Sequence, residues 1–406
     1  MVHPPTPAPY PITALSAVNA LGTTLAAIAG ALRAGRSGLA PCTFPLPFQT
    51  FTGALPADLP APPAALRSHD SRQCRLALLA LEELAAPARA AVRRWGAARV
   101  AIVAATSTGG ILETERAYAE HRRTGALPPA FDFDRMQGFP GIVDPVRAVT
   151  GADGVALVIS TACSSSGKAF ASARRLLRSG AADAAIVGGV DTLCDTTLRG
   201  FASLQALSPG PCRPFSARRD GLTIGEGGGF ALLEREGDAA VWLLGTGESS
   251  DAHHMSHPHP EGLGARLAME AALRQAGMGV GELDLVNAHG TGTPANDVVE
   301  AGAIAALLGE AAPRVSVIST KGYTGHLLGS AGITEAVLSG LSITGGFVPA
   351  SLGAAPLDEA IALRGLRIPL ATELRPVRRA LSNSFAFGGS NVAVILGATG
   401  ARGARA

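Results

Sequence analysis

The sequence is poor in aromatic residues and in charge, and it has no long basic run. Aromatic residues make up 4% of the 406 residues and charged residues 16%, with a formal net charge of +2. No basic stripe interleaved with aromatics indicates a groove for nucleic acid. The 47% hydrophobic content and 50 glycines instead indicate a well-buried α/β protein with an aliphatic core.

Cysteine is also scarce and lacks the pairing of a disulfide framework. The five cysteines are Cys42, Cys74, Cys163, Cys194 and Cys212, and no two form a CxxC pair. An odd number at wide spacing fits a reducing compartment better than a secreted, disulfide-stapled fold. We therefore expect a cytoplasmic protein.

A long uninterrupted apolar run is missing as well. The Ala/Leu-rich stretch 12–32 contains Ser16, Asn19, Thr23 and Thr24, which makes it too polar for a membrane span. A signal peptide would need a basic start, which this stretch lacks. It predicts a strand, a turn and an amphipathic helix, and we expect no membrane span anywhere.

Short apolar runs alternate with stretches of helical spacing along the whole chain. Strand-like runs are 100–104, 155–159, 185–190, 230–233, 241–244, 283–287, 315–318, 380–384 and 392–396. Helical stretches include 71–84, 168–179, 262–276, 295–308 and 330–343. The alternation predicts α/β layers in which helices cover buried sheets. A charged turn at 235–240 marks a soft boundary between halves 1–238 and 239–406.

Cys163 lies in the run Thr-Ala-Cys-Ser-Ser-Ser, between a strand-like run and a helical stretch. This places the thiol at a strand-to-helix turn, where unpaired N–H groups and the positive end of the helix dipole favour a thiolate. The turn suits an exposed nucleophile. A lone cysteine is more often a small buried hydrophobe, however, so the neighbouring motifs must decide.

Two further Gly-rich turns follow strands and carry histidine or lysine. His289 lies in Asn-Ala-His-Gly-Thr-Gly-Thr-Pro, and Lys321 and His326 lie in Thr-Lys-Gly-Tyr-Thr-Gly-His. One histidine after a strand is more often structural. Two of them, with a lysine and a cysteine in similar turns, form a nucleophile-and-base arrangement.

The segment 382–391, Ser-Asn-Ser-Phe-Ala-Phe-Gly-Gly-Ser-Asn, predicts a strand, a turn and a second strand. Backbone N–H groups in such a turn can stabilise an oxyanion. Taken alone, it is equally an ordinary Gly-rich hairpin.

Together these motifs resemble the β-ketoacyl-[acyl carrier protein] synthases of the elongating, Cys-His-His type. The similarity extends from about Ile12 to Gly397, with the motifs in the family's order. It implies the thiolase fold, in which two similar α/β halves with stacked mixed sheets enclose buried helices (αβαβα layers). Members of the family are usually dimers.

The resemblance assigns a role to each motif. Cys163 would accept the acyl chain, and His289 and His326 would donate to the enolate formed from malonyl-acyl carrier protein. Lys321, partnered by Glu335, would hold the histidine region electrostatically. Backbone N–H groups of Cys163 and Phe387 would form the oxyanion hole. The reaction would be a decarboxylative Claisen condensation that lengthens the acyl thioester by two carbons.

Substrate-binding residues are also implied. Thr291 and Thr293 would line the pantetheine channel. Thr108 would lie at the bottom of the acyl pocket, and Phe385 and Phe387 would lie beside that pocket. No cofactor is expected on this chain, because the phosphopantetheine belongs to the acyl carrier protein.

The expected partners are an acyl carrier protein and a second ketosynthase-like subunit, in a homodimer or in a heterodimer with a chain-length factor. The carrier protein is acidic in this family, and the arginines that are candidates for docking it are Arg72, Arg75, Arg213, Arg218 and Arg219. Solvated surface charge is an equally good interpretation of these arginines.

Two alternatives of a different class remain open at this point. A non-catalytic, chain-length-determining subunit would lack the nucleophile that this chain keeps. A thiolase acting on coenzyme A esters would need a second cysteine near the C-terminus, and none lies beyond Cys212.

Several residues depart from the family pattern. Ala386 stands where the family usually has glycine, and Thr108 places a polar side chain at the expected acyl pocket. Lys168 lies one helical turn beyond Cys163, where it either lowers the pKa of the thiol or points to solvent. These departures lead to the hypothesis of a polyene or aryl-polyene pathway. No metal is expected, because prolines 258 and 260 interrupt the histidines at 253, 254, 257 and 259 and no carboxylate or cysteine cluster completes a site.

Overall fold

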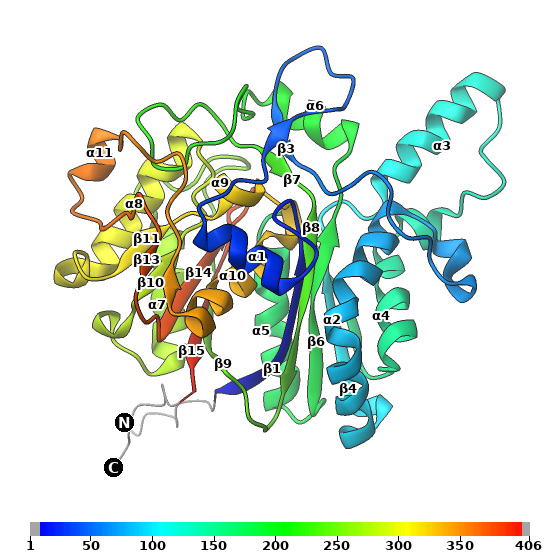
Figure 1. Cartoon of the computed structure of the whole chain (residues 1–406), viewed down its shortest axis with the longest axis horizontal. Helices are drawn as coiled ribbons and strands as arrows, with labels where there is room; N and C mark the ends of the chain where they lie inside the picture. Colours follow the sequence, from blue (N-terminus) through cyan, green and yellow to red (C-terminus); the bar gives the residue numbers. More distant parts are fainter. Residues whose placement is uncertain (1–8, 400–406) are drawn as a thin grey trace.

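The computed structural model describes residues 9–399, and its centre is a ten-stranded mixed sheet. The sheet runs in the order β11-β10-β14-β15-β9-β1-β8-β6-β4-β5 (Figure 1). Its strands are β1 (Tyr10–Val18), β4 (Val100–Ala105), β5 (Ala156–Ile159), β6 (Ala184–Asp191), β8 (Gly227–Glu234), β9 (Val241–Ser250), β10 (Leu285–Asn287), β11 (Ser316–Ile318), β14 (Arg379–Phe385) and β15 (Ser390–Ala398).

The two halves of this sheet have the same topology. Numbered within each half, the strand order from the outer edge inward is 3-2-4-5-1 both for β5-β4-β6-β8-β1 and for β11-β10-β14-β15-β9. In each half the first two neighbour contacts are parallel and the next two are antiparallel. The two similar α/β halves implied by the sequence are therefore confirmed. The division at residues 238 and 239 itself stays a prediction.

The halves are joined for only a short distance. β1 pairs with β9 through residues 10–12 and 241–243, after which β1 continues along β8 and β9 along β15. The sheet therefore splits into two layers. Two helices, α5 (Ser165–Arg178) and α10 (Ala331–Gly345), lie between these layers and contact strands of both halves.

The two central helices approach each other closely where they begin. A Cβ on Gly332 would lie 2.7 Å from the backbone nitrogen of Gly167, so a larger residue there would force the helices apart. Ser166 strengthens the contact, because its hydroxyl accepts the Ile333 backbone N–H at 2.9 Å. This contact fixes the Cys163 turn relative to the segment that carries His326.

Outer helices cover both exposed faces of the sheet layers (Figure 1). α2 (Arg72–Trp95) and α4 (Val143–Thr150) cover the first half, and α7 (Leu263–Ala276) and α8 (Pro294–Leu308) cover the second. Local sequence starts these helices. Ser71 caps α2 by accepting the Cys74 N–H at 3.1 Å, and Pro294 occupies the first turn of α8, where no N–H partner is needed.

The strands and helices predicted from periodicity all form, with boundaries shifted by a few residues and with α2 and β9 longer than expected. The predicted N-terminal strand and helix are β1 and α1 (Leu25–Arg33). Periodicity missed α3 (Ile111–Thr124), α4 and α6 (Asp195–Ser203), of which α3 projects from the body (Figure 1). The small elements are β2 (Ala40–Pro41), β3 (Phe51–Gly53), β7 (Ile224–Gly225), β12 (Phe347–Val348), β13 (Glu373–Leu374), α9 (Lys321–Thr324) and α11 (Glu359–Ala362).

Within residues 9–399, no helix combines the length and the apolar character needed to cross a lipid bilayer.

Candidate active site

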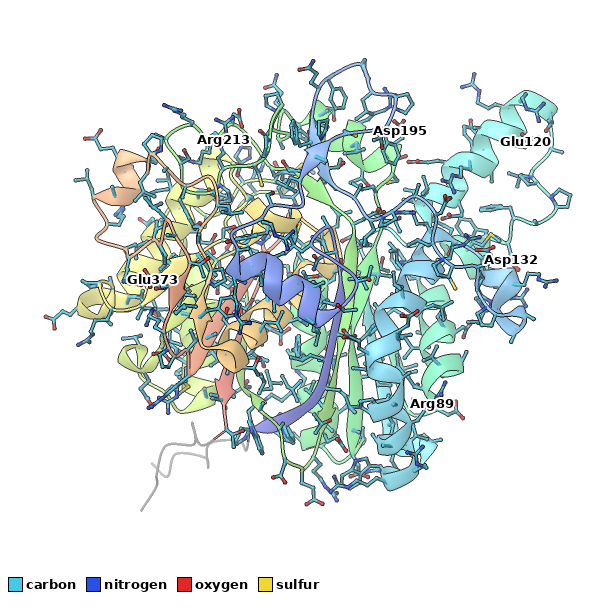
Figure 2. The ribbon with its side chains drawn as sticks, viewed as in Figure 1. Arg89, Glu120, Asp132, Asp195, Arg213 and Glu373 are labelled. Carbon is cyan, nitrogen blue, oxygen red and sulfur yellow. The ribbon has the colours of Figure 1, made fainter. Side chains whose placement is uncertain are left out.

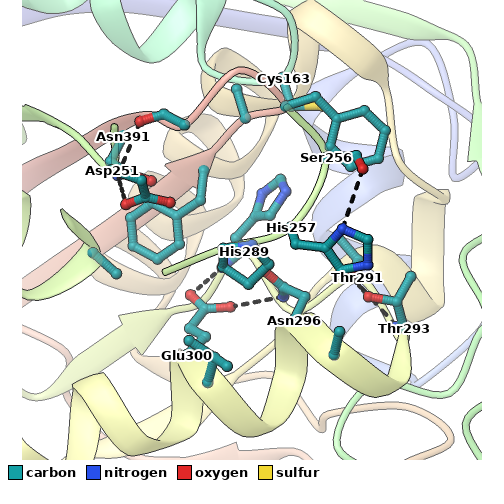
Figure 3. A pocket seen from close by; sticks show the side chains of 18 of the residues that line it. Cys163, Asp251, Ser256, His257, His289, Thr291, Thr293, Asn296, Glu300 and Asn391 are labelled. Carbon is teal, nitrogen blue, oxygen red and sulfur yellow. Dashed lines mark hydrogen bonds between the residues drawn. The ribbon is translucent and has the colours of Figure 1, made fainter. Parts of the chain in front are cut away.

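Cys163, His289 and His326 line one pocket. Figure 3 shows Cys163 and His289 in it. Cys163 comes from the turn between β5 and α5, His289 follows β10, and His326 follows α9. One ligand atom of each, the Cys163 sulfur and a ring nitrogen of each histidine, lies within 4.8 Å of the other two. The structure thus brings together three residues that are far apart in the sequence, each delivered by a turn just after a strand or short helix.

The Cys163 turn is strained in a way that fixes the thiol. Ala162 has φ +50°, in the left-handed region that a non-glycine residue rarely adopts. Ser165 stabilises the turn, because its hydroxyl donates to the Ala162 carbonyl at 2.5 Å and accepts the Thr161 N–H at 2.9 Å. Strain of this kind persists only where the surroundings enforce it, and it is concentrated at functional sites.

The thiol of Cys163 is buried, with only 7% of the residue exposed. This differs from the exposed nucleophile predicted from the turn. Burial raises the pKa of the Cys163 thiol to about 11, and Lys321 and the backbone N–H groups of Phe387 and Cys163 oppose the rise only in part. The cysteine is therefore a thiol at neutral pH, and its proton must leave during acyl transfer.

We expect alkylation of Cys163 to report this protonation state. The rate with iodoacetamide should rise about tenfold per pH unit from pH 7 to pH 10, because only the thiolate reacts and its fraction grows tenfold per unit below the pKa. Peptide mass spectrometry at each pH measures the rate for Cys163 alone. A plateau near pH 7 would show that the helix N-terminus outweighs burial.

Lys321 fixes the tautomer of His289. The Lys321 ammonium is buried, donates to the His289 carbonyl, and lies 3.3 Å from His289 Nδ1. An ammonium has no acceptor, so Nδ1 must accept, and the ring proton is held on Nε2. His289 therefore presents an N–H donor from its far ring nitrogen.

The charge of Lys321 is balanced by Glu335 on α10, as the sequence anticipated for a partner. Their Nζ and Oε1 atoms are 2.5 Å apart, and both side chains are almost fully buried. Burial still raises the pKa of the Glu335 carboxyl to about 7, against the lowering effect of Lys321. The Glu335 carboxyl thus titrates near neutrality.

His326 completes the arrangement. Its ring lies edge-on to that of His289, with centroids 5.1 Å apart and planes at 85°. Burial and the charge of Lys321 hold the pKa of both imidazoles well below the ordinary histidine value. Both histidines are consequently neutral at physiological pH, and each carries one donor and one acceptor.

Two buried carboxylates on α8 position the His289 turn and were missed from the sequence. Glu300 accepts the backbone N–H groups of His289 and Gly290, both at 2.7 Å. Asp297, one helical turn earlier, accepts those of Gly292 and Phe215. The signal was present, because two acids three residues apart share one face of a helix otherwise rich in alanine, valine and leucine.

The hairpin loop between β14 and β15 covers the pocket, and Phe385 and Phe387 line it. The ring of Phe387 stacks on Phe201 of α6 at 5.7 Å between centroids. Ala386 does not adopt a positive φ, whereas Gly388 and Gly389 do, at +83° and +75°. The alanine is therefore accommodated without strain in a turn that the two glycines make.

The His-rich loop 251–259 is tied to this hairpin loop across the pocket mouth. The Asn391 amide donates to Asp251 at 2.7 Å (Figure 3). The Gly388 N–H donates to the Met255 carbonyl at 2.7 Å. His254 and His257 lie on the same loop, with their Nδ1 atoms 3.1 Å apart. Both loops therefore border the route to Cys163.

The two threonines expected to contact pantetheine lie at the pocket, and that role stays a prediction. Thr291 and Thr293 line the pocket, and their hydroxyl oxygens are 2.9 Å apart. Thr108 is not among the residues lining this pocket. Its hydroxyl and N–H bond Asp191 instead, at 3.1 and 3.2 Å. Its role in the acyl pocket stays a prediction.

Two of the five arginines suggested for carrier docking are unavailable. Arg72 forms a buried ion pair with Glu226 and donates to three carbonyls of the 55–57 segment, and Arg219 has a 7%-exposed side chain bonded to Asp358 at 2.7 Å. This corrects the expectation for both, because each is consumed by structural contacts. Arg75 is held by both oxygens of Asp70.

Arg213 and Arg218 remain candidates for carrier docking. Arg218 is exposed, and Arg213 lies at the same face of the molecule as α6 (Figure 2). Arg213 is also next to the channel, since its backbone nitrogen would lie 3.3 Å from a Cβ on Gly292.

Lys168 is paired with a carboxylate of the second half. Its ammonium lies 3.5 Å from Glu248 on β9. The charge with the largest effect on the pKa of the Cys163 thiol is that of Lys321, which is far from Cys163 in the sequence.

Among the described residues, the one set of three clustered cysteine, histidine or carboxylate ligand atoms belongs to Cys163, His289 and His326 themselves. Their donor set is one that zinc accepts. The same three residues are the ones to which the resemblance assigns acyl transfer and decarboxylation. The expectation that the chain uses no metal or cofactor stays a prediction.

Comparison with known proteins agrees with the motif order. Residues 11–239 match the family model described as the N-terminal domain of β-ketoacyl synthase, and residues 241–355 match its C-terminal domain. The chain is 33% identical to 3-oxoacyl-[acyl-carrier-protein] synthase 2 of Synechocystis sp., over 94% of this chain and 96% of the relative.

Two other similar proteins are informative. The chain is 39% identical to 3-oxoacyl-[acyl-carrier-protein] synthase 2 of Rhizobium meliloti, over 59% of this chain and 59% of the relative, so that alignment spans about three fifths of each length. Its structure resembles the ketosynthase ApeO, solved in complex with its chain length factor ApeC from Xenorhabdus doucetiae. The TM-score is 0.90 at 38% identity, covering 98% of this chain and 100% of that one.

Proposed function

The chain belongs to the β-ketoacyl synthase family, and on this premise we propose that it catalyses the decarboxylative condensation of an acyl thioester with malonyl-acyl carrier protein. The observation that carries the proposal is the set of two neutral, buried imidazoles facing the buried thiol, with Lys321 holding the His289 proton on Nε2. This set supplies a nucleophile and two donors without a metal or a prosthetic group.

The first step transfers the acyl chain. A bond forms between Cys163 Sγ and the acyl carbonyl carbon, the carbon–sulfur bond to the carrier arm breaks, and the Cys163 proton passes to the departing thiol. The backbone N–H groups of Cys163 and Phe387 both lower the pKa of the Cys163 thiol, so both are directed toward its sulfur. This supports their role as donors to the oxygen of the acyl carbonyl that the sulfur attacks.

The second step removes carbon dioxide from the malonyl thioester. Its carboxyl carbon–carbon bond breaks, and the negative charge moves to the thioester oxygen as an enolate. His289 Nε2–H and His326 donate to that oxygen, which stabilises the charge where it develops. The enolate carbon then attacks the acyl carbonyl, and the bond to Cys163 breaks with the sulfur leaving as a thiolate. The β-ketoacyl thioester leaves on the carrier, and the thiolate takes up a proton from solvent.

A panel of loaded carrier proteins tests the proposal and the polyene hypothesis together. With malonyl-acyl carrier protein, we expect the acyl group of the product to exceed that of the donor by two carbons, two hydrogens and one oxygen, with carbon dioxide released. Donors are saturated, unsaturated and aryl-enoyl chains of matched length. Equal or better use of saturated chains would remove the polyene hypothesis and leave the condensation intact, whereas no product from any donor would contradict both.

The outer strand β5 supports assembly with a second ketosynthase-like subunit. β5 terminates the ten-stranded sheet, and within residues 9–399 it pairs with β4 alone. Val155 and Leu157 beside this edge are 43% and 38% exposed. An unpaired edge with exposed apolar side chains favours pairing with another chain. We propose that this edge forms the subunit interface.

Leu157→Arg should therefore shift the chain from dimer to monomer in light scattering after size-exclusion chromatography, because a charge would be buried unpaired at the interface. Leu267→Arg is the matched control, since Leu267 is 40% exposed on α7. An unchanged mass for Leu157→Arg, or a wild type that is already monomeric, would contradict an interface at β5.

A further inference from the structure

A buried carboxylate that the proposed mechanism does not use lies at the C-terminal end of β6. Asp191 is fully buried, and its two oxygens accept hydrogen bonds from two separate segments. The segment that follows β4 supplies four donors: the hydroxyls of Thr106 and Thr108 at 2.6 and 3.1 Å, and the backbone N–H groups of Ser107 and Thr108 at 2.9 and 3.2 Å. The turn before α10 supplies a fifth, the Ser330 N–H at 3.0 Å. Asp191 therefore joins the two segments.

The five contacts fit the ionised form of Asp191. Three of them come from backbone N–H groups, which can only donate and so require an acceptor. Burial raises the pKa of the Asp191 carboxyl, and the hydrogen bonds from residues 106–108 lower it. A protonated carboxyl would turn its own O–H toward one of these donors. The contacts therefore describe a carboxylate that is satisfied on both oxygens.

The turn that Asp191 holds begins at His326, one of the two candidate donors to the enolate. Leu328 in this turn has φ +51°, in the left-handed region that a leucine rarely adopts. Such a conformation persists only where the surroundings enforce it. Ser330 closes the turn, because its hydroxyl donates to the Gly227 carbonyl at 2.8 Å and its N–H donates to Asp191. The carboxylate is thus one of the contacts that enforce the strained turn.

Close packing makes the position of this turn depend on Asp191. A Cβ on Gly329 would lie 2.7 Å from the Ser107 backbone nitrogen and 2.9 Å from Asp191 Oδ2, so the turn lies directly against the segment 106–108. α10 begins directly after the turn and contacts the start of α5. A displacement of the turn would therefore move His326 and loosen the contact between the two central helices.

The charge of Asp191 also reaches the nucleophile. Burial is the main reason for the raised pKa of the Cys163 thiol, and the Asp191 carboxylate raises that pKa further, whereas the Lys321 ammonium lowers it. Loss of the carboxylate should therefore make the thiol more acidic. This effect can be measured on Cys163 without any turnover of substrate.

We propose that Asp191 is a positioning residue for the condensation, which fixes the turn that carries His326 against the segment 106–108 and so aligns the imidazole for decarboxylation. The inference rests on the proposed function, because it assigns Asp191 to that reaction. Asp191 is not among the residues that line the pocket, so it acts through the Ser330 N–H and the turn.

Asp191→Asn tests the proposal with two measurements. The amide keeps the shape of the carboxylate but has only one acceptor oxygen, so one of the two segments loses its partner. In carbon dioxide release from malonyl-acyl carrier protein, kcat should fall about 10- to 100-fold and KM should change less than about threefold, because a displaced imidazole loses its alignment with the enolate. Alkylation of Cys163 by iodoacetamide at pH 8 should become about threefold faster, because the thiolate fraction rises.

Two further variants give matched comparisons. Asp191→Glu keeps the carboxylate and adds one buried methylene, so it should lower Tm but keep the wild-type alkylation rate and at least about a third of the carbon dioxide release. Asp183→Asn, directly before the other end of β6, weakens ion pairs with Arg99 and Arg235. It should lower Tm as well and leave both readouts unchanged.

The buried cysteines Cys74 and Cys212 serve as internal monitors of opening in the same peptide mass spectra. Their alkylation should stay as slow in Asp191→Asn as in the wild type. If they react faster together with Cys163, the variant has opened locally and the proposal is overturned.

Other results would also overturn it. One is an unchanged carbon dioxide release in Asp191→Asn, and another is an equal loss in Asp183→Asn. Loss of the release in Asp191→Glu at the wild-type alkylation rate would show that the carboxylate is not what positions the turn, and this comparison decides the matter if Asp191→Asn does not fold. A wild type that releases no carbon dioxide would contradict the proposed function instead.

Discussion

Replacing Cys163 with alanine should abolish acyl transfer and lower the condensation rate by a factor of about 10⁴ or more, because removal of a nucleophile leaves only binding and oxyanion stabilisation. Incubation with an acyl-carrier protein should add the acyl mass to the wild type and none to Cys163→Ala. Peptide mapping should place the wild-type adduct on Cys163.

The same variant separates the two half-reactions. His289, His326 and Lys321 remain in Cys163→Ala, so release of carbon dioxide from malonyl-acyl carrier protein should persist. Cys42→Ala is the control, since Cys42 is partly exposed whereas the other four cysteines are buried. A wild type that gains no acyl mass would favour the non-catalytic subunit, and an acyl adduct on a cysteine other than 163 would contradict the proposed nucleophile.

The second large effect concerns the buried ion pair behind His289. Lys321→Met removes the cation that holds the His289 proton on Nε2 and that pairs with Glu335 at 2.5 Å. Decarboxylation should fall about 10²–10³-fold, the loss expected for one oxyanion donor. Carbon dioxide release under single-turnover conditions measures this effect without depending on acyl transfer.

The stability of Lys321→Met should depend on pH with a definite sign. Burial already raises the pKa of Glu335 to about 7, and loss of the cation raises it further. A carboxyl group whose pKa is higher in the folded than in the unfolded protein favours folding while it is protonated. The free energy of unfolding then decreases as pH rises through the folded-state pKa. The deficit relative to wild type should therefore be small at pH 6 and approach about 3–5 kcal/mol near pH 9, where an unpaired carboxylate is buried.

A double variant identifies the cause. Lys321→Met with Glu335→Leu removes both charges from the interior, so urea unfolding at pH 9 should recover most of the lost free energy. Decarboxylation should stay low, because the histidine tautomer is still unassigned. Recovery of the activity together with the stability would mean that Lys321 serves the fold alone.

Much of this architecture was predictable because buried strands read as continuous apolar runs and the reactive turns follow them directly. The elements that were missed lack that signal. α3 is largely polar and projects from the body, so only Leu112 and Ala117 of its residues are buried. The pairing of Lys321 with Glu335 was predicted from the resemblance to the family, because no local sequence pattern indicates it.

The sequence could not distinguish similar side chains that have different surroundings. Arg174 and Arg175 are adjacent, yet the first is buried without a partner and the second is exposed and paired. Arg72 reads as a surface charge and is instead enclosed by Glu226 and backbone carbonyls. The depth of Cys163 likewise depends on the second half of the chain, which no inspection of its own turn reveals.

That dependence has a consequence for biosynthesis. Of the residues that line the pocket, only Cys163, Phe201 and Leu222 precede residue 251, and the later ones form the rest of the wall. The ribosome makes the chain from its N-terminus, so the cysteine emerges long before the segment that will enclose it. The nascent protein therefore carries an open thiol, and oxidants or alkylating agents should modify it most readily during translation, before the mature enzyme has closed over it.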